Sequence, residues 1–205
     1  MACFSPVKSI PSLVLQSLDM GAVQISKELE GLAKLVTSRK VRNFMEIGTE
    51  TGGTFWLFCQ LAHEDGIKIS LDKPDGASGS WKFADFEAHN ARSERLRGFA
   101  KYVHPIVADS HGSIAKGLVS GALDGDKLDF LFIDGDHTYD GVKADYLDYK
   151  EFVRPGGLIG FHDIVDTQYH RDRGCFVADF WNELQGKKHE FCSGWEWGGI
   201  GVIEN

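Results

Sequence analysis

Short apolar runs alternate with longer amphipathic stretches along most of the chain. Leu128–Ile133 is apolar at nearly every position, which is typical of a strand that is covered on both faces. Four other runs have the length of buried or half-buried strands. The pattern therefore predicts five β-strands, at Phe44–Ile47, Ile67–Asp72, Val103–Val107, Leu128–Ile133 and Leu158–Phe161. Pro155-Gly-Gly is expected to end the preceding helix and to begin the last strand.

The stretches between these runs repeat their apolar residues with the period of a helix. Ile25, Leu29, Leu32 and Val36 form one stripe of a helix that starts near Gly21. Three roles remain open for this helix: covering the sheet, capping a pocket or pairing with another subunit. Residues 1–20 have no clear period and predict an extended arm or a short helix. Further helices are predicted at about 54–61, 83–99, 113–119, 139–149 and 176–184.

Strands that alternate with helices predict an α/β domain with a mostly parallel sheet. Two shorter runs near the end of the chain, His189–Cys192 and Ile200–Ile203, are close enough in sequence for an antiparallel hairpin. No internal repeat, long linker or low-complexity block interrupts the pattern. We therefore expect a single domain, in which residues 1–40 form an arm and a helix that pack on a domain of residues 41–205.

Charge and cysteine content narrow the function classes. The 205 residues carry a net charge of −8 at pH 7, whereas a protein that grips a phosphate backbone needs a basic face. We therefore expect neither a nucleic-acid partner nor an anionic membrane. The four cysteines are scattered without a CxxC pair, and no run reaches the roughly 18 apolar residues of a membrane span. Free thiols and a cytoplasmic protein are expected.

The first predicted strand runs directly into a glycine-rich turn and then into an apolar helix. Gly48, Gly52 and Gly53 allow a sharp turn and the close approach of a ligand to the backbone. The helix that follows offers its free N–H groups and positive end to such a ligand. We expect the binding site to be organised around this turn.

Polar side chains stand at or just after the ends of the other predicted strands. In an open parallel sheet, ligands bind beyond the carboxyl ends of the strands, where the strand order reverses. A lone acid at such a position often caps a helix, but the joint placement of several at one edge favours binding. The candidates are Asp72, Asp109 with Ser110, Asp134 to His137, and His162 with Asp163.

Asp72 follows the glycine turn by about 20 residues, the spacing at which an acid accepts hydrogen bonds from both hydroxyls of a ribose. Asp109 and Ser110 are candidates for contact with an adenine edge. The residues therefore predict a cofactor that contains adenosine, without saying which one.

Glu46-Ile-Gly48-Thr-Glu-Thr-Gly52-Gly53 resembles motif I of the class I S-adenosylmethionine-dependent methyltransferases. Phe132–Tyr139 and Arg154–Asp163 look like the branch that includes small-molecule O-methyltransferases and cephalosporin-hydroxylase-like proteins. The similarity runs from about Val41 to Ile203, and the ordered combination of these segments is specific. It implies a Rossmann-like fold with a mostly parallel seven-stranded sheet, an antiparallel last strand and helices on both faces.

The resemblance also implies roles for individual residues. Glu46 and Gly48 border the methionine part of S-adenosylmethionine, Asp72 its ribose, and Asp109 with Ser110 its adenine. Thr49, Gly52, Gly53 and Asp134 complete the expected cofactor site. In metal-dependent relatives, an acid after the fourth strand and a polar pair after the fifth hold Mg²⁺, and those positions match Asp134, His162 and Asp163. The base of such relatives falls on His137.

The implied reaction is methyl transfer to a small molecule, in the first place to a hydroxyl. A sulfonium methyl needs no activation, so the enzyme aligns the acceptor and removes its proton. A divalent ion lowers the pKa of the hydroxyl, and a neutral imidazole takes the proton. Oxygen ligands favour Mg²⁺, whereas a histidine among them favours Mn²⁺, Fe²⁺ or Zn²⁺. Transfer to nitrogen stays open, as does a homo-oligomer formed through the N-terminal helix.

Two positions depart from the family pattern. Glu50 stands in place of the usual middle glycine of motif I, where it could bind the methionine ammonium or point to solvent. His162-Asp163 replaces Asp-Asp or Asp-Asn, so His162 could instead orient the substrate or donate to a backbone carbonyl. Tyr169–Arg173 and Trp195–Trp197 suit a sugar or polyketide-like ring, although the tryptophans could equally cover the sheet edge.

Two other function classes remain open. A nicotinamide-dependent oxidoreductase would share the fold and the ribose acid, and Tyr146 with Lys150 matches its Tyr-x-x-x-Lys pair. Tyr146 falls on an apolar stripe, however, and the GxGxxG fingerprint is absent. The other class is a binding or regulatory protein that keeps the pocket without catalysis.

Overall fold

A computed structural model describes residues 9–73 and 86–205 of the chain. Its centre is a seven-stranded sheet in the order β3-β2-β1-β4-β5-β7-β6. The neighbours from β3 to β5 pair in parallel, whereas β7 runs antiparallel to both β5 and β6. This is the mostly parallel sheet that was predicted. The strands are β1 (Phe44–Ile47), β2 (Lys68–Asp72), β3 (Val103–Val107), β4 (Leu128–Ile133), β5 (Val153–His162), β6 (Lys188–Phe191) and β7 (Ile200–Glu204).

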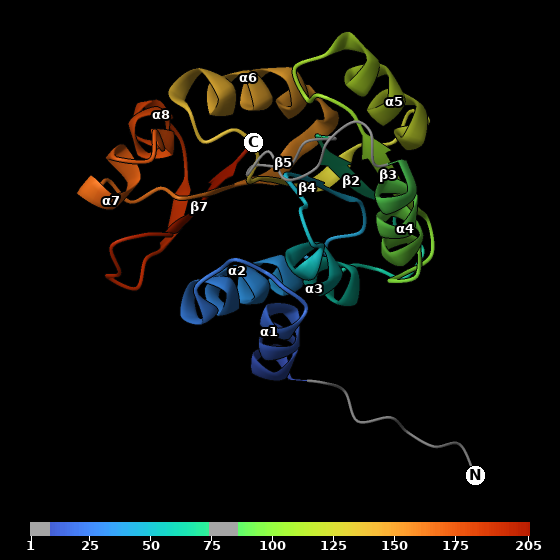
Figure 1. Ribbon diagram of the computed structural model, residues 1–205, viewed down its shortest axis with the longest axis horizontal. Coiled ribbons are helices and arrows are strands. Elements are labelled where there is room, and N and C mark those ends of the chain that lie inside the picture. The colour runs from blue at the N-terminus through green and yellow to red at the C-terminus, as the bar shows by residue number, and fades with distance from the viewer. Residues whose placement is uncertain (1–8, 74–85) are drawn as a thin grey trace.

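Helices cover both faces of this sheet (Figure 1). One buried core lies under α1 to α4, and the other lies under α5, α6 and α8. β4 contributes side chains to both cores, which explains its continuous apolar sequence. The helices are α1 (Ile10–Asp19), α2 (Ser26–Ser38), α3 (Gly53–Leu61), α4 (Phe86–Arg97), α5 (Ser113–Leu123), α6 (Tyr139–Tyr149), α7 (Gln168–Arg171) and α8 (Val177–Glu183).

The N-terminal part follows one of the two predicted alternatives, because α1 is a short helix capped by the Ser9 side chain. The next helix, α2, begins at Ser26 rather than near Gly21. Gly21 has a φ of +98°, which no right-handed helix accommodates. Three residues of the predicted stripe, Leu29, Leu32 and Val36, are buried in the core under α2, so this helix covers the sheet, whereas Ile25 precedes the helix and is half-buried. Residues 1–8 of the predicted arm and residues 83–85 of the helix predicted at 83–99 lie outside the described residues.

Two further boundaries differ from the prediction. The sequence Pro155-Gly-Gly neither ends α6 nor begins β5: the helix ends at Tyr149, and the strand begins at Val153. The pairing of β5 with β4 shifts register beside this sequence, at Leu128, and a strand tolerates proline at such an irregularity. The helix α5 continues to Leu123, because its buried stripe extends beyond Val119.

Glu28 ties α2 to the loop between β6 and β7. Its side chain is 2% exposed. One carboxylate oxygen accepts hydrogen bonds from the Ser193 N–H and hydroxyl, both at 2.7 Å, and the other accepts from the Gly199 N–H at 2.8 Å. These bonds compensate for the burial of the carboxylate. They also hold the loop that carries Trp195 and Trp197.

Replacing Glu28 with alanine is expected to lower the free energy of unfolding by about 2–3 kcal/mol, because the partners of a buried charged group are left without it. Glu30→Ala is the matched control on the same helix. Glu30 has a surface pair with Lys34 at 3.7 Å, which is expected to contribute about 0.5 kcal/mol or less. Denaturant unfolding of the two variants measures the difference, and equal losses would contradict the anchoring role of Glu28.

The strand order reverses between β1 and β4. From β1 the chain continues outward to β2 on one side, and from β4 it continues to β5 on the other. A crevice forms at such a reversal, beyond the carboxyl ends of the strands. None of the helices in the described part of the chain has the length and apolar content that crossing a membrane requires.

Candidate functional site

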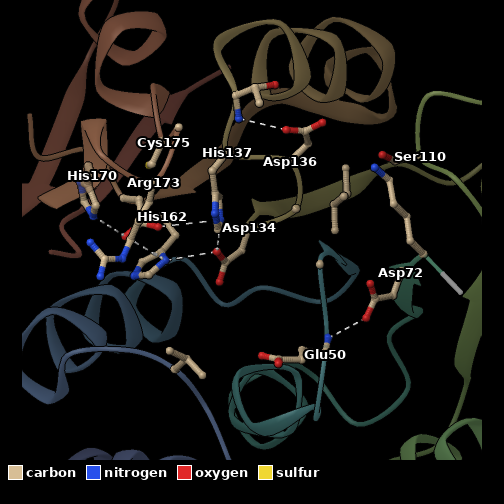
Figure 2. Close-up of a pocket in the computed structure, with 18 of the residues that line it drawn as sticks. Glu50, Asp72, Ser110, Asp134, Asp136, His137, His162, His170, Arg173 and Cys175 are labelled. Carbon is tan, nitrogen blue, oxygen red and sulfur yellow. Dashed lines mark hydrogen bonds and ion pairs between the residues drawn. The ribbon is translucent and has the colours of Figure 1, made fainter. Parts of the chain in front are cut away.

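A cavity of about 650 Å³ opens at the carboxyl ends of β1, β2, β4 and β5. It is lined from the glycine turn after β1 to the segment between α7 and α8, and Figure 2 shows acids and histidines converging on it. Of the predicted residues, the lining includes Gly48, Asp72, Ser110, Asp134, His137, His162 and Asp163. The tertiary structure thus brings together residues from five separate segments.

Gly48 allows the turn after β1 to pass close to the chain after β4. Its φ is +83°, and a Cβ at this position would lie 1.9 Å from the carbonyl oxygen of Asp134. Only glycine fits such an approach and such a backbone conformation. The neighbouring Glu50 also has a left-handed backbone, with a φ of +43°, and its exposed side chain lines the cavity.

The other two glycines of the turn serve helix packing. A Cβ at Gly52 would meet the Leu96 side chain at 2.6 Å, and one at Gly53 would meet the Ala22 nitrogen at 2.2 Å. Thr49 is buried and accepts a hydrogen bond from the Ser70 hydroxyl at 2.8 Å. These contacts hold the glycine turn against α4, β2 and the chain after α1. Thr49 and Gly53, but not Gly52, line a small neighbouring cavity of about 30 Å³.

Asp72, the predicted ribose acid, lies at the end of β2 and faces the cavity. One of its oxygens accepts hydrogen bonds from the Glu50 N–H at 2.7 Å and from the Arg92 guanidinium at 2.6 Å. Burial raises the pKa of Asp72, and Arg92 opposes that shift. Arg92 also donates to the Glu50 carbonyl at 2.7 Å, so it braces both the acid and the turn. The prediction had not included Arg92, which lies on a charge-rich helix without a motif.

Of the two residues that were predicted to contact adenine, Asp109 and Ser110, only Ser110 lines the cavity. Ser110 is buried, and its carbonyl accepts a hydrogen bond from the Tyr149 hydroxyl at 2.7 Å. Asp109 is exposed and does not belong to the lining; its carboxylate accepts a hydrogen bond from the His111 N–H at 3.1 Å, within the local turn. The cavity wall in this region is formed by Ala108 and Ser110.

Glu46 lies within β1, beneath the cavity, and is 1% exposed. Burial and the nearby Asp134 carboxylate raise the pKa of Glu46 well above its usual range. One of its oxygens has no hydrogen-bond partner among the described residues, and the same holds for the side-chain oxygen of Gln24. Gln24 lines the small cavity and offers its oxygen to a ligand that donates hydrogen bonds, whereas Glu46 lines neither cavity.

The Asp134 carboxylate contacts three other side chains of the site. One carboxylate oxygen lies 3.1 Å from His137 Nε2 and 3.1 Å from His162 Nδ1, and the other accepts a hydrogen bond from the Gln24 amide at 2.8 Å. Burial favours the neutral acid, but His162 and His137 outweigh it and lower the pKa of Asp134 to about 2. Burial likewise opposes the charged form of His162, and Asp134 outweighs it and raises the pKa of His162 to about 9.

The polar residues at or just after the ends of β4 and β5 differ in their access to the cavity. The His137 side chain is 34% exposed, whereas that of His162 is 4% exposed. Donor atoms of Asp134, His137 and His162 lie within 4.8 Å of one another, a spacing that could hold a metal ion. Asp163, which the prediction grouped with them, has an oxygen 3.5 Å from His162 Nδ1 and also approaches His170 and Cys175.

The segment after β5 forms the wall opposite the glycine turn. Tyr169, His170, Arg173 and Cys175 line the cavity there, and Trp197 lines it from the loop between β6 and β7. The Arg173 guanidinium stacks on the Tyr169 ring, 3.7 Å from its centroid. The prediction had considered Tyr169–Arg173 and Trp197 for the acceptor, but not Cys175, whose only sequence signal is a lone cysteine. The prediction did not include Gln24 either, because this residue lies in a loop that contains no motif.

Tyr146 and Lys150, the pair that an oxidoreductase would use, lie away from this cavity. The Tyr146 ring packs on Phe161 and Phe180 in the core, with centroids 6.0 Å and 5.5 Å apart. The Lys150 ammonium lies over the same ring at 5.2 Å. The match to Tyr-x-x-x-Lys is therefore a feature of packing at the end of α6, where Lys150 follows the last helical residue.

A family model described as a methyltransferase domain matches residues 45–164, which is more than half of the chain. The chain therefore belongs to this family of methyltransferase domains. A curated relative from Sinorhizobium fredii, an uncharacterised protein, is 25% identical over 158 residues. The alignment covers 73% of this chain but only 16% of that protein, so the chain spans about a sixth of its length.

Solved structures of O-methyltransferases share the fold. The O-methyltransferase TomG from Streptomyces achromogenes, solved in complex with S-adenosylmethionine, matches with a TM-score of 0.60 at 17% identity, over 97% of this chain and 90% of that one. An O-methyltransferase from Bacillus cereus, solved with S-adenosylhomocysteine, also gives a TM-score of 0.60 at 17% identity, over 99% and 94% of the two chains. The predicted Rossmann-like methyltransferase fold is confirmed.

Proposed function

We propose that this protein transfers the methyl group of S-adenosylmethionine to a hydroxyl of a small molecule. One observation carries the proposal: a single cavity joins the turn at Gly48, the acid at Asp72 and the Asp134–His137 pair. The turn and Asp72 suit an adenosine cofactor, and the Asp134–His137 pair suits the removal of a proton from the acceptor. Family membership and the shared fold of the O-methyltransferases support the same reading.

The cavity has the features that the cofactor requires. Asp72 faces it with a carboxylate that suits ribose hydroxyls. Gln24, which lines the small neighbouring cavity, has a buried side-chain oxygen without a partner among the described residues, and this acceptor suits the ammonium of a methionine moiety. The wall at Ala108 and Ser110 suits a flat base. When bound, S-adenosylmethionine supplies an electrophilic methyl on a sulfonium.

His137 has the position of a general base. His137 Nε2 lies 3.1 Å from an Asp134 oxygen. In the neutral tautomer that donates Nε2–H to this carboxylate, Nδ1 keeps the lone pair. The acceptor oxygen forms the new bond to the methyl carbon, the carbon–sulfur bond breaks with its electrons going to sulfur, and His137 takes the acceptor's proton. Asp134 orients the imidazole and stabilises its charged form. The products are a methyl ether and S-adenosylhomocysteine.

Asp134 and His162 are the residues that would hold a divalent ion, with Asp163 beside them. The donors include an imidazole nitrogen, so Mn²⁺, Fe²⁺ or Zn²⁺ fits better than Mg²⁺. Such an ion would lower the pKa of an acceptor hydroxyl. Because His137 is the more exposed imidazole, it remains the residue that meets the acceptor.

Calorimetry tests the cofactor first. We expect S-adenosylhomocysteine to bind and NADPH not to bind, and we expect added Mn²⁺ to change the heat if Asp134 and His162 hold an ion. Binding of NADPH in place of S-adenosylhomocysteine would refute the proposal. Turnover is then measured on phenolic and glycosylated acceptors. Tight cofactor binding without turnover on any acceptor would favour a regulatory protein.

Asp72→Ala is expected to weaken S-adenosylhomocysteine binding by about 10–100-fold, because hydrogen bonds from the ribose to a charged group are lost. Asp72→Asn, which keeps one acceptor oxygen, is expected to lose less. Asp65→Ala is the control, since this exposed acid lies in the turn before β2, at the other end of the strand. Equal affinity of Asp72→Ala and the wild type would exclude a ribose contact.

A further inference from the structure

A second group of metal-type side chains lies in the cavity wall behind the methyl-transfer residues. It consists of Asp163 after β5, His170 on α7 and Cys175 before α8, and it is defined here as the Asp–His–Cys cluster. Each residue is buried, with 8%, 4% and 8% of its surface exposed. One donor atom from each lies within 4.8 Å of the others. We propose that this cluster binds a divalent transition-metal ion with affinity for sulfur, such as Zn²⁺.

The His170 ring is oriented as in protein metal sites. Its Nδ1–H donates to the Val165 carbonyl at 2.7 Å. A metal-binding imidazole commonly makes this kind of bond with its other nitrogen, which fixes the tautomer and directs the remaining lone pair at the ion. Here the remaining lone pair belongs to Nε2, which lies 3.2 Å from an oxygen of Asp163.

Asp163 Oδ1 lies between two imidazoles, 3.5 Å from His162 Nδ1 and 3.2 Å from His170 Nε2. This oxygen is buried and accepts no well-directed hydrogen bond from the described residues. A carboxylate oxygen and an imidazole lone pair repel each other at 3.2 Å unless a proton or a metal ion lies between them. The contact with Asp163 raises the pKa of His170, so a proton holds the place between them until a metal ion displaces it. The backbone at Asp163 has a φ of +61°, so the site is held in a conformation that side chains rarely adopt. The Gly198 N–H, 3.3 Å from Nε2, makes a long contact that ion binding would release.

Cys175 supplies the donor that decides which ion binds. Burial raises the pKa of its thiol to about 12, so the free thiol is unreactive, and a metal ion must displace its proton to bind. Sulfur, nitrogen and oxygen donors together favour Zn²⁺ or Co²⁺ over Mg²⁺. All three residues line the cavity, which gives the ion a route from solvent.

An ion in this cluster would join the end of β5 to the segment between α7 and α8. Arg173 in that segment and Tyr169 on α7 both line the cavity, and Figure 2 labels Arg173 there. The cluster differs chemically from Asp134, His137 and His162, which offer oxygen and nitrogen only. Of these two groups of described residues, only the Asp–His–Cys cluster offers a sulfur ligand.

Cobalt spectroscopy tests the site on the full-length protein. After treatment with a chelator, the protein is titrated with Co²⁺, and we expect a thiolate-to-cobalt charge-transfer band in the near ultraviolet. Added Zn²⁺ should abolish the band. Cys175→Ser should lack it, whereas Cys192→Ser, a change at an exposed free cysteine, should retain it. Losing a hydrogen-bond partner of a metal ligand typically weakens metal binding by roughly 10–100-fold. His170→Gln removes a ligand itself, so we expect it to weaken Co²⁺ binding by at least that much.

The absence of the band in the wild type, or its persistence in Cys175→Ser, would overturn the proposal. Circular dichroism and S-adenosylhomocysteine calorimetry of Cys175→Ser establish that the variant is folded. The proposal is independent of the proposed methyl transfer. Cofactor binding without the cobalt band would refute the Asp–His–Cys site alone, and the band without cofactor binding would refute the methyltransferase assignment alone.

Discussion

Replacing His137 with glutamine is expected to lower the rate of methyl transfer by about 100-fold or more, the usual contribution of a positioned general base. The affinity for S-adenosylhomocysteine should change little. His137 lies 3.1 Å from Asp134 and is 34% exposed, so it combines a fixed orientation with access to the cavity. Glutamine keeps a polar side chain of similar reach but cannot take a proton at neutral pH.

The comparison requires an acceptor that the wild type methylates, with rates measured at saturating cofactor. His63→Gln is the matched control, because His63 is exposed in the connection between α3 and β2. It should retain full activity. If His137→Gln retains full activity as well, another group removes the proton. If it loses cofactor affinity and rate together, His137 holds the cofactor site in shape rather than acting as the base.

Gly48→Ala is expected to lower the free energy of unfolding by about 2–6 kcal/mol and to abolish cofactor binding. The added Cβ would lie 1.9 Å from the Asp134 carbonyl oxygen, which is backbone and cannot turn aside. The φ of +83° adds strain of about 1–3 kcal/mol for a residue with a side chain. Forcing the two segments apart adds an overpacking cost of about 1–3 kcal/mol.

Gly117→Ala provides the control for this prediction. Gly117 lies within α5, and a Cβ there would meet nothing within 4 Å. Alanine should stabilise the helix by about 0.5–1 kcal/mol. Denaturant unfolding and calorimetry with S-adenosylhomocysteine measure both effects. A Gly48→Ala variant with normal stability and normal cofactor affinity would contradict the close approach of the two strand ends.

Much of the fold could be predicted because local patterns reflect burial directly. The bounds of β1, β3 and β4 agree with the predicted runs, since apolar residues stop where a strand leaves the core. The beginning of β5 was wrong, because Pro155 and the glycines after it signal a turn locally, whereas pairing with β4 continues the strand around them. The short helix α7 was not predicted, because four residues are too few for a periodic pattern.

The glycine turn after β1 also shows what local sequence patterns fail to predict. A sequence motif suggests that all its glycines cradle the ligand, but spacing contains no information about what lies behind each one. Gly48 meets the chain after β4, whereas Gly52 packs against α4 and Gly53 against the chain after α1. Asp109 and Ser110 are adjacent in sequence, yet only Ser110 lines the cavity.

By itself, the sequence determined the α/β class, the order of strands and helices and the edge of the sheet at which polar residues gather. These features depend on apolar periodicity and on turn residues, which are local properties of the chain. The tertiary structure decided which side chains meet there. Arg92 at Asp72, Gln24 at Asp134 and Cys175 beside Asp163 come from segments without any motif. Their contacts arise from helix packing across the sheet, and no local pattern encodes that geometry.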